Sequence, residues 1–163
     1  MIENFLQLLK KICEGDEFSW QTLKKFFDEK KLSADEQVQA FSYIKQAARR
    51  NVYAMYAQAL LYDIGLGAKQ DLEMSFILMR EAAVLGHAAA TYEVGRRFLF
   101  GMGIEQNYQN AFQWLIRAAE SPYYYSAAMY HVGLIYEKGW GVLSDAAKAK
   151  EWMEKAAAKG YKP

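Results

Sequence analysis

Apolar residues recur every three or four positions along most of the chain, and no run alternates with the period of two that is typical of strands. The only prolines are Pro122 and Pro163, so almost nothing interrupts a helix. The pattern predicts three helix pairs: 52–64 with 71–85, 88–100 with 107–120, and 126–138 with 145–159. Weaker signals predict helices near 2–13, 18–30 and 34–49. The sequence therefore predicts an all-α protein of about nine helices in antiparallel pairs.

An internal repeat is the strongest signal in the chain. A Gly-x-Gly motif occurs at Gly65-Leu66-Gly67, Gly101-Met102-Gly103 and Gly139-Trp140-Gly141, at spacings of 36 and 38 residues (65 to 101 to 139). The same spacings separate three alanine pairs, which start at Ala82, Ala118 and Ala156, and three candidate helix caps, Asp71, Asn107 and Asp145. Agreement at this many positions in three copies is typical of repeat proteins.

One helix pair cannot bury its apolar face alone, so we expect neighbouring pairs to stack into a single repeat domain over 1–163. Its expected parts are an N-terminal capping helix at 1–16, a divergent repeat at 17–50, and repeats at 51–86, 87–124 and 125–163. The alternative for the first helix is a membrane-surface helix. The C-terminal edge would stay half covered, which makes it a candidate surface for a homodimer or another partner, unless the native chain continues past Pro163.

The Gly-x-Gly motif resembles a phosphate-binding loop, but its position in the chain favours a structural turn. Phosphate loops follow a strand and open a helix, whereas each copy here follows a predicted helix. We expect the first glycine to end that helix in the left-handed conformation. The middle residue is expected to point outward, so Trp140 is a candidate contact residue.

These motifs resemble the Sel-one-like repeat, a relative of the tetratricopeptide repeat. The third copy carries the family pattern almost completely, at Val132, Gly133, Tyr136, Gly139, Gly141, Val142, Asp145, Ala149, Trp152, Ala156 and Ala157. The second copy has Trp114 at the position of Trp152, and the first copy has Leu78 there. The resemblance covers residues 50–160, and more weakly 18–50.

The resemblance implies a right-handed α-solenoid that acts as a non-enzymatic adaptor in protein complexes. Relatives are common in bacteria, among signalling proteins and host-directed effectors. A cysteine-rich branch, associated with β-lactam binding, pairs cysteines within each repeat. The only cysteine here, Cys13, lies outside the repeats, so the resemblance does not extend to that branch. A β-lactam-binding or hydrolytic enzyme is the alternative function, and a self-associating structural protein is another.

The composition adds limits on partners and location. The 20 basic and 19 acidic residues give a net charge of +1 and are dispersed, which argues against nucleic acid as a partner. A single cysteine excludes an intrachain disulfide and favours a reducing compartment. The N-terminal segment lacks the features of a secretory signal, and no apolar run is long enough to span a bilayer. We expect a cytoplasmic protein, with non-classical bacterial export as the alternative.

The chain offers little for catalysis. His87 and His131 are its only histidines, and neither belongs to a motif with metal-ligand or nucleophile–base spacing. We therefore expect no catalytic residue, no metal site and no cofactor, and assign both histidines structural or surface roles.

The inner face of the first helices is the expected place for a partner segment. Glu93, Arg96, Arg97 and Phe100 combine charge with an apolar anchor, which predicts a groove for a peptide that carries an acidic residue beside an apolar one. The alternative is a solvated face with extended arginines. The remaining candidates for partner contact are His131, Lys138, Tyr123, Tyr124 and Trp140. Tyr123 and Tyr124 follow Pro122 in a turn that is two residues longer than its counterpart in the previous copy.

Overall fold

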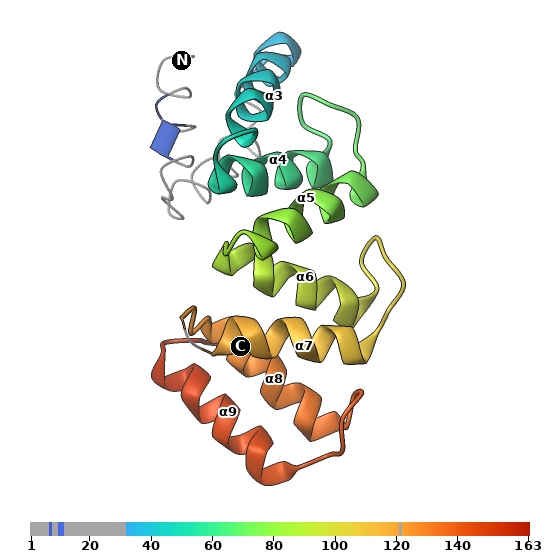
Figure 1. Cartoon of the computed structure of the whole chain (residues 1–163), viewed down its shortest axis with the longest axis vertical. Helices are drawn as coiled ribbons and strands as arrows, with labels where there is room; N and C mark the ends of the chain where they lie inside the picture. The colour runs from blue at the N-terminus through green and yellow to red at the C-terminus, as the bar shows by residue number, and fades with distance from the viewer. Residues whose placement is uncertain (1–6, 8–9, 12–31, 121) are drawn as a thin grey trace. The chain divides into compact units, whose positions relative to one another are not determined.

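The computed structural model describes residues 7, 10, 11, 32–120 and 122–163. Within these residues every regular element is an α-helix (Figure 1). The helices are α3 (Ala34–Ala48), α4 (Val52–Ile64), α5 (Leu72–Val84), α6 (Ala88–Phe100), α7 (Tyr108–Ala119), α8 (Ser126–Lys138) and α9 (Ala146–Ala158). Of the helix predicted at 2–13, and of the predicted capping segment at 1–16, the structure describes residues 7, 10 and 11 alone, and these are helical. The helix predicted at 18–30 and Cys13 lie outside the described residues.

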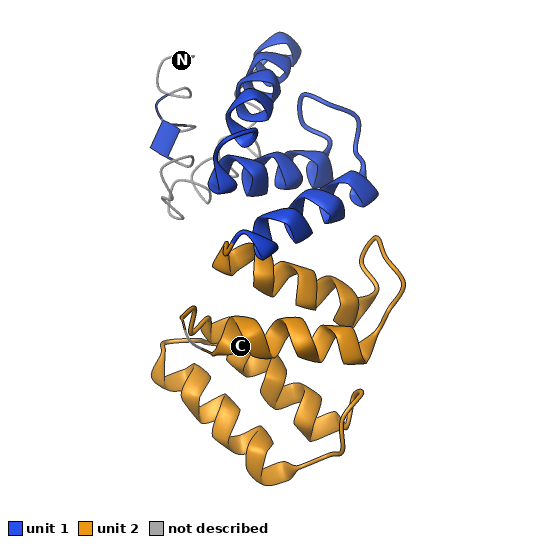
Figure 2. Cartoon of the chain, viewed as in Figure 1, with its two compact units in different colours: residues 1–85 blue, residues 86–163 orange. Residues whose placement is uncertain are grey.

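The chain divides into two compact units, residues 1–85 and 86–163 (Figure 2). The described helices of unit 1 are α3 to α5, and those of unit 2 are α6 to α9. Within each unit every helix packs on the next one along the chain. The pairs α4–α5, α6–α7 and α8–α9 each run back alongside one another through a Gly-x-Gly turn (Figure 1). The prediction of an all-α fold built from antiparallel helix pairs is confirmed.

The second helix of each pair begins where a side chain caps it. The side-chain oxygens of Asp71, Asn107 and Asp145 accept hydrogen bonds from the backbone N–H three residues later, at 2.8, 2.9 and 3.0 Å. Each cap satisfies an N–H group that has no partner inside the helix. The backbone N–H of the same residue donates to the first helix of its own pair, as from Asn107 to the Phe98 carbonyl at 2.9 Å. The predicted caps are confirmed, and the same residue also ties the second helix to the first.

Removing one cap gives a local test of this arrangement. Replacing Asn107 with alanine is expected to destabilise unit 2 by about 1 kcal/mol, because the Asn110 N–H loses its acceptor at the start of α7. Asn107→Asp keeps an acceptor and is the matched control. The measurement is urea unfolding, together with amide exchange at Asn110. Equal exchange protection of Asn110 in the alanine and aspartate variants would contradict the assignment of the cap.

The first helix of each pair ends at the first glycine of the turn. Gly65, Gly101 and Gly139 have φ between 68° and 69°, a left-handed conformation that costs other residues about 1–2 kcal/mol. The N–H of the following residue then bonds the carbonyl five positions back, as from Leu66 to Leu61 at 3.0 Å. This is the Schellman pattern. The predicted helix stop is confirmed in all three copies.

The second glycine lets the turn approach the preceding second helix. A Cβ atom at Gly67 would lie 2.2 Å from the carbonyl oxygen of Gln37 on α3, and one at Gly141 would lie 2.9 Å from backbone carbon of Tyr108 on α7. Gly103 shares their positive φ, at 74°. Contact at this distance leaves no room for any side chain. In unit 1 the turn after α4 therefore lies against α3, and in unit 2 the turn after α8 lies against α7.

Small residues also allow close approach where the two helices of a pair face each other. A Cβ atom at Gly95 or Gly133 would lie 2.7 Å from the side chain of Leu115 or Met153, on the second helix of the same pair. The corresponding residue of the first copy is Ala59, which is fully buried. The repeated alanines Ala82, Ala118 and Ala156 are also buried. The partly buried Trp114 lies under Arg117, and Trp152, which packs against the core of unit 2, lies under Lys155. Glycine and alanine at these contacts therefore let the two helices of each pair pack closely together.

Candidate partner-binding surface

The first helices of unit 2 carry a continuous set of rings, which we call the aromatic face. It consists of Tyr92 and Phe100 on α6, Tyr130 and His131 on α8, Tyr125 just before α8, and Tyr161 after α9. The His131 ring lies 5.6, 5.9 and 5.7 Å from the rings of Tyr92, Phe100 and Tyr130, measured between centroids. These separations fall within the range of favourable ring contacts. His131 is therefore the hub at which α6 and α8 meet.

Two similar ring pairs extend the aromatic face. Tyr125 stacks on Tyr92 with centroids 5.0 Å apart, and Tyr161 packs on Tyr130 at 4.9 Å, with interplanar angles of 29° and 32°. The two pairs hold similar places in their repeats: Tyr92 and Tyr130 are 38 residues apart, and Tyr125 and Tyr161 are 36 apart because the turn before α8 has two extra residues. Neither Tyr125 nor Tyr161 was among the sequence candidates. The position just before a first helix is taken by His87 before α6 and by Tyr125 before α8, whereas Tyr161 follows α9, the last described helix.

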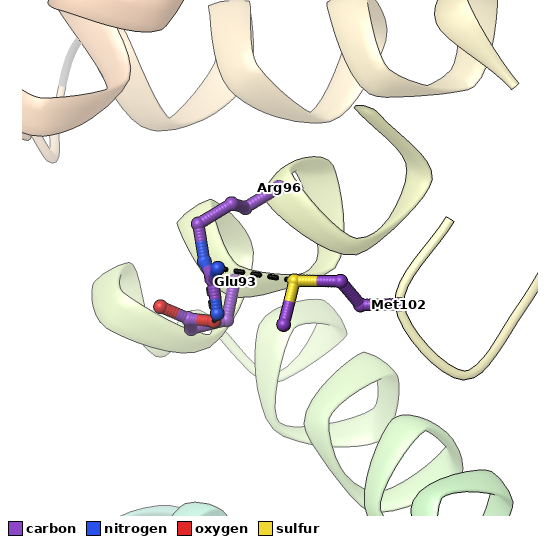
Figure 3. A network of polar contacts seen from close by, with 3 residues as sticks. All are labelled: Glu93, Arg96 and Met102. Atoms are coloured by element: carbon purple, nitrogen blue, oxygen red, sulfur yellow. Dashed lines mark hydrogen bonds and ion pairs between the residues drawn. The ribbon is translucent and has the colours of Figure 1, made fainter. Parts of the chain in front are cut away.

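Arg96 borders this face and is held by its own helix. Its Nε and Nη2 atoms donate to one carboxylate oxygen of Glu93 at 3.0 and 2.8 Å. Its Nη1 atom donates to the Met102 sulfur at 3.1 Å, from the middle of the Gly-x-Gly turn (Figure 3). Charge-assisted contacts from two sides fix the guanidinium plane. The face therefore combines fixed rings with a cation whose charge is largely compensated by Glu93.

Exposure separates the sequence candidates on α6. Phe100 is 48% exposed, whereas Arg97 is 3% exposed. The expectation of a groove lined by both arginines therefore fails at Arg97, because the turn of the helix carries this residue to the buried side. Arg96 and Glu93 are half-buried and in contact with each other, and Phe100 on the same helix is exposed. His131 is 9% exposed and shapes the face from beneath rather than offering its ring to solvent.

Burial also decides the ionisation of two members of the aromatic face. Burial lowers the pKa of His131 below its usual value, although a hydrogen bond with the Ala127 carbonyl opposes this. The Nδ1 atom is 2.8 Å from that carbonyl oxygen, which can only accept, so Nδ1 carries the proton of the neutral ring. Burial, with Glu93 nearby, raises the pKa of Tyr92 to about 12. Both shifts favour the uncharged forms of the His131 and Tyr92 rings at neutral pH.

In the longer turn before α8, Tyr124 is exposed and Tyr123 and Tyr125 are half-buried. Tyr124 is 51% exposed and has a positive φ of 48°, and Lys159 lies 5.4 Å from its ring centroid. Tyr123 is half-buried, with its hydroxyl 3.5 Å from where a Cβ atom would stand on Gly86. Tyr124 is thus the candidate of this turn that a partner can reach most readily.

The two remaining candidates lie at the far end of α8. Lys138 is half exposed and pairs with Glu137 at 3.7 Å. Trp140 is half-buried and stacks on Tyr108 with centroids 5.6 Å apart and planes 6° apart. The expectation that the middle residue of the turn points outward does not hold for Trp140, nor for the buried Leu66. The indole covers the start of α7 instead, because Gly141 brings the turn so close.

The described residues contain no group of three His, Cys, Asp or Glu side chains that could hold a metal ion. His87 serves as the N-cap of α6, with Nδ1 accepting from the Ala90 N–H at 3.1 Å. The Nδ1 atoms of both histidines therefore contact the backbone of their own helices. Over the same residues, no helix is long and apolar enough to cross a membrane.

Comparisons with known proteins agree with this architecture. The Sel1 repeat family model matches residues 30–52, 52–87, 88–123 and 126–161. No curated protein sequence matches the chain. Among solved structures, a Sel1 repeat protein from Oxalobacter formigenes is 31% identical with a TM-score of 0.71, over 76% of this chain and 49% of that one.

A second similar structure is c5321, a protective antigen present in uropathogenic Escherichia coli strains that displays an SLR fold. It is 26% identical with a TM-score of 0.75, over 99% of this chain and 34% of that one. The chain thus spans half or less of the length of both proteins. Sel1 repeats are generally protein-interaction scaffolds, and their fold is typically non-enzymatic. The chain belongs to the Sel1 repeat family.

Proposed function

We propose that this protein is a non-enzymatic scaffold that binds a segment of a partner protein on the aromatic face of unit 2. The half-exposed ring of Phe100 carries this proposal, because it lies against His131 and shares helix α6 with Arg96, whose guanidinium is held by Glu93. Aromatic and arginine side chains on rigid elements are enriched among residues that dominate binding energy. The partner segment we expect has an apolar or aromatic anchor that packs on Phe100 and Tyr92.

The charge on this face has a smaller role than the sequence suggests. Glu93 already pairs with Arg96, so an acidic partner residue meets a cation that is largely neutralised. An acidic partner residue would have to compete with two short hydrogen bonds that Arg96 already donates to the Glu93 carboxylate. We therefore expect the rings to supply most of the affinity and Arg96 to set the orientation of the segment.

Variants on the aromatic face test this proposal. The experiment is affinity capture with quantitative mass spectrometry, in a lysate of the organism that encodes the chain. Phe100→Ala is expected to reduce recovery of the bound partner about tenfold, and Arg96→Ala by a smaller factor. Val84→Ala is the matched control, because it shortens a side chain in unit 1 that is 63% exposed. If the Phe100 variant recovers every partner as well as the native protein, the aromatic face is not the binding surface.

The enzymatic alternative has a direct test of its own. Purified protein that hydrolyses nitrocefin or reacts with an acyl probe would overturn the non-enzymatic part of the proposal. A host-directed or exported role stays a prediction from the family resemblance. Finding the captured partner among proteins of a host cell would support it.

A further inference from the structure

A groove of about 440 Å³ runs along the outer side of α9. We call it the α9 groove; it is lined by Glu137, Ala146, Ala149, Lys150, Met153, Glu154 and Ala157. Its apolar lining comes from three alanines and Met153, whereas Glu137, Lys150 and Glu154 supply charge. Lys150 and Glu154 are 77% and 68% exposed and lie 3.8 Å apart as an ion pair. None of these residues belongs to the aromatic face.

The repeat shows what kind of element this groove accepts. The equivalent positions one repeat earlier, 38 residues back, are Leu99, Tyr108, Ala111, Phe112, Leu115, Ile116 and Ala119. All seven belong to the apolar core of unit 2, where α8 packs against α7. The α9 groove is therefore the counterpart of a surface that holds a helix.

The helix that binds in the α9 groove must differ in chemistry from α8, because the lining of the groove is more highly charged than the surface that holds α8. Where the inner surface has Leu99, Phe112 and Ile116, the α9 groove has Glu137, Lys150 and Glu154. An apolar helix such as α8 would remove these charges from water and offer them no new polar contact, at a large energetic cost. The occupant must present small residues to the apolar lining and opposite charges, in reverse order, to Lys150 and Glu154.

The α9 helix itself meets this description. We propose that the α9 groove binds the α9 groove of a second copy, with the two helices antiparallel. A twofold axis between Glu151 and Trp152 places Ala146 opposite the second copy's Ala157, and Lys150 opposite its Met153. The Lys150 ammonium then lies beside the second copy's Glu154, and the symmetric contact repeats this pairing. The alanines at both ends allow the helix axes to approach closely.

Charge exchange tests this dimer in the full-length protein by sedimentation equilibrium. One helix edge is a small interface, so we expect a dissociation constant of about 10 to 100 µM. Lys150→Glu and Glu154→Lys should each weaken self-association at least about tenfold, because like charges then face each other. An equimolar mixture of the two variants should regain native affinity, since the acidic pair of one copy faces the basic pair of the other. Both side chains are exposed, so folding should be unchanged.

Glu151→Lys is the matched control. It reverses an exposed charge of the same helix that pairs with Lys155 outside the groove, and it should leave association unchanged. The proposal is overturned if the native protein stays monomeric up to about 1 mM. It is also overturned if the dimer tolerates either single variant, or if mixing the two variants fails to restore association. The last result would show that another register or another partner fills the groove.

Discussion

Replacing Gly67 with alanine is expected to destabilise unit 1 by about 3 kcal/mol or more, the largest effect of a single methyl group that the described residues offer. The new Cβ atom would lie 2.2 Å from the Gln37 carbonyl oxygen and 2.7 Å from the Phe41 Cβ atom. Both belong to α3, so neither can move aside as a flexible side chain would. Either α3 shifts away from the turn, or the turn lifts and Leu66 leaves the core of unit 1.

Gly65→Ala separates the two causes of this loss. Gly65 has nearly the same φ, 68° against 69°, but its added Cβ atom would lie 3.1 Å from its nearest neighbours. Alanine there carries the cost of the left-handed conformation with a milder steric conflict, so we expect a loss of about 1–2 kcal/mol. The measurement is urea unfolding combined with amide exchange in α3. If the Gly67 variant is no less stable than the Gly65 variant, the inferred close contact between the turn and α3 is wrong.

Helix bounds could be predicted from the sequence because their signals are local. The first helices of the three repeats end at a glycine whose left-handed conformation few other residues adopt, and the second helices begin at a capping side chain. The predicted ranges 52–64, 88–100 and 126–138 match α4, α6 and α8 at both ends. A residue type that satisfies a backbone group within a few positions needs no knowledge of the rest of the fold.

The candidate surface could be predicted only in part, because burial depends on neighbouring helices. Arg96 and Arg97 are adjacent and chemically identical, yet one borders the aromatic face and the other is 3% exposed. No local pattern separates them. Trp140 was misjudged for a similar reason, since its stacking on Tyr108 follows from how closely Gly141 approaches α7. The repeat alignment did contain the signal for Tyr125 and Tyr161, whose spacing matches that of the motifs.

The second large effect is expected at His87, whose neutral imidazole caps α6. Burial lowers the pKa of His87 to about 4, against about 6.5 in an unfolded chain. Between these values the unfolded state binds more protons, so stability rises with pH there and is lost as the pH falls from about 6.5 toward 4. A protonated ring cannot accept from the Ala90 N–H, and its charge would lie at the positive end of the α6 dipole. The native protein should lose about 2 to 3 kcal/mol of unfolding free energy between pH 7 and about pH 4.5 from this group.

His87→Asn isolates this contribution, because asparagine caps a helix without titrating in this range. Carboxylates and His131 titrate in both proteins, so the difference between the two stability profiles reports on His87 alone. Urea unfolding at several pH values should give profiles that diverge between about pH 4 and about pH 6.5, where the native protein gains stability with rising pH and the variant does not. An NMR titration of the His87 ring should place its midpoint near 4. Parallel profiles with a midpoint close to 6.5 would mean that His87 is solvated and that another group caps α6.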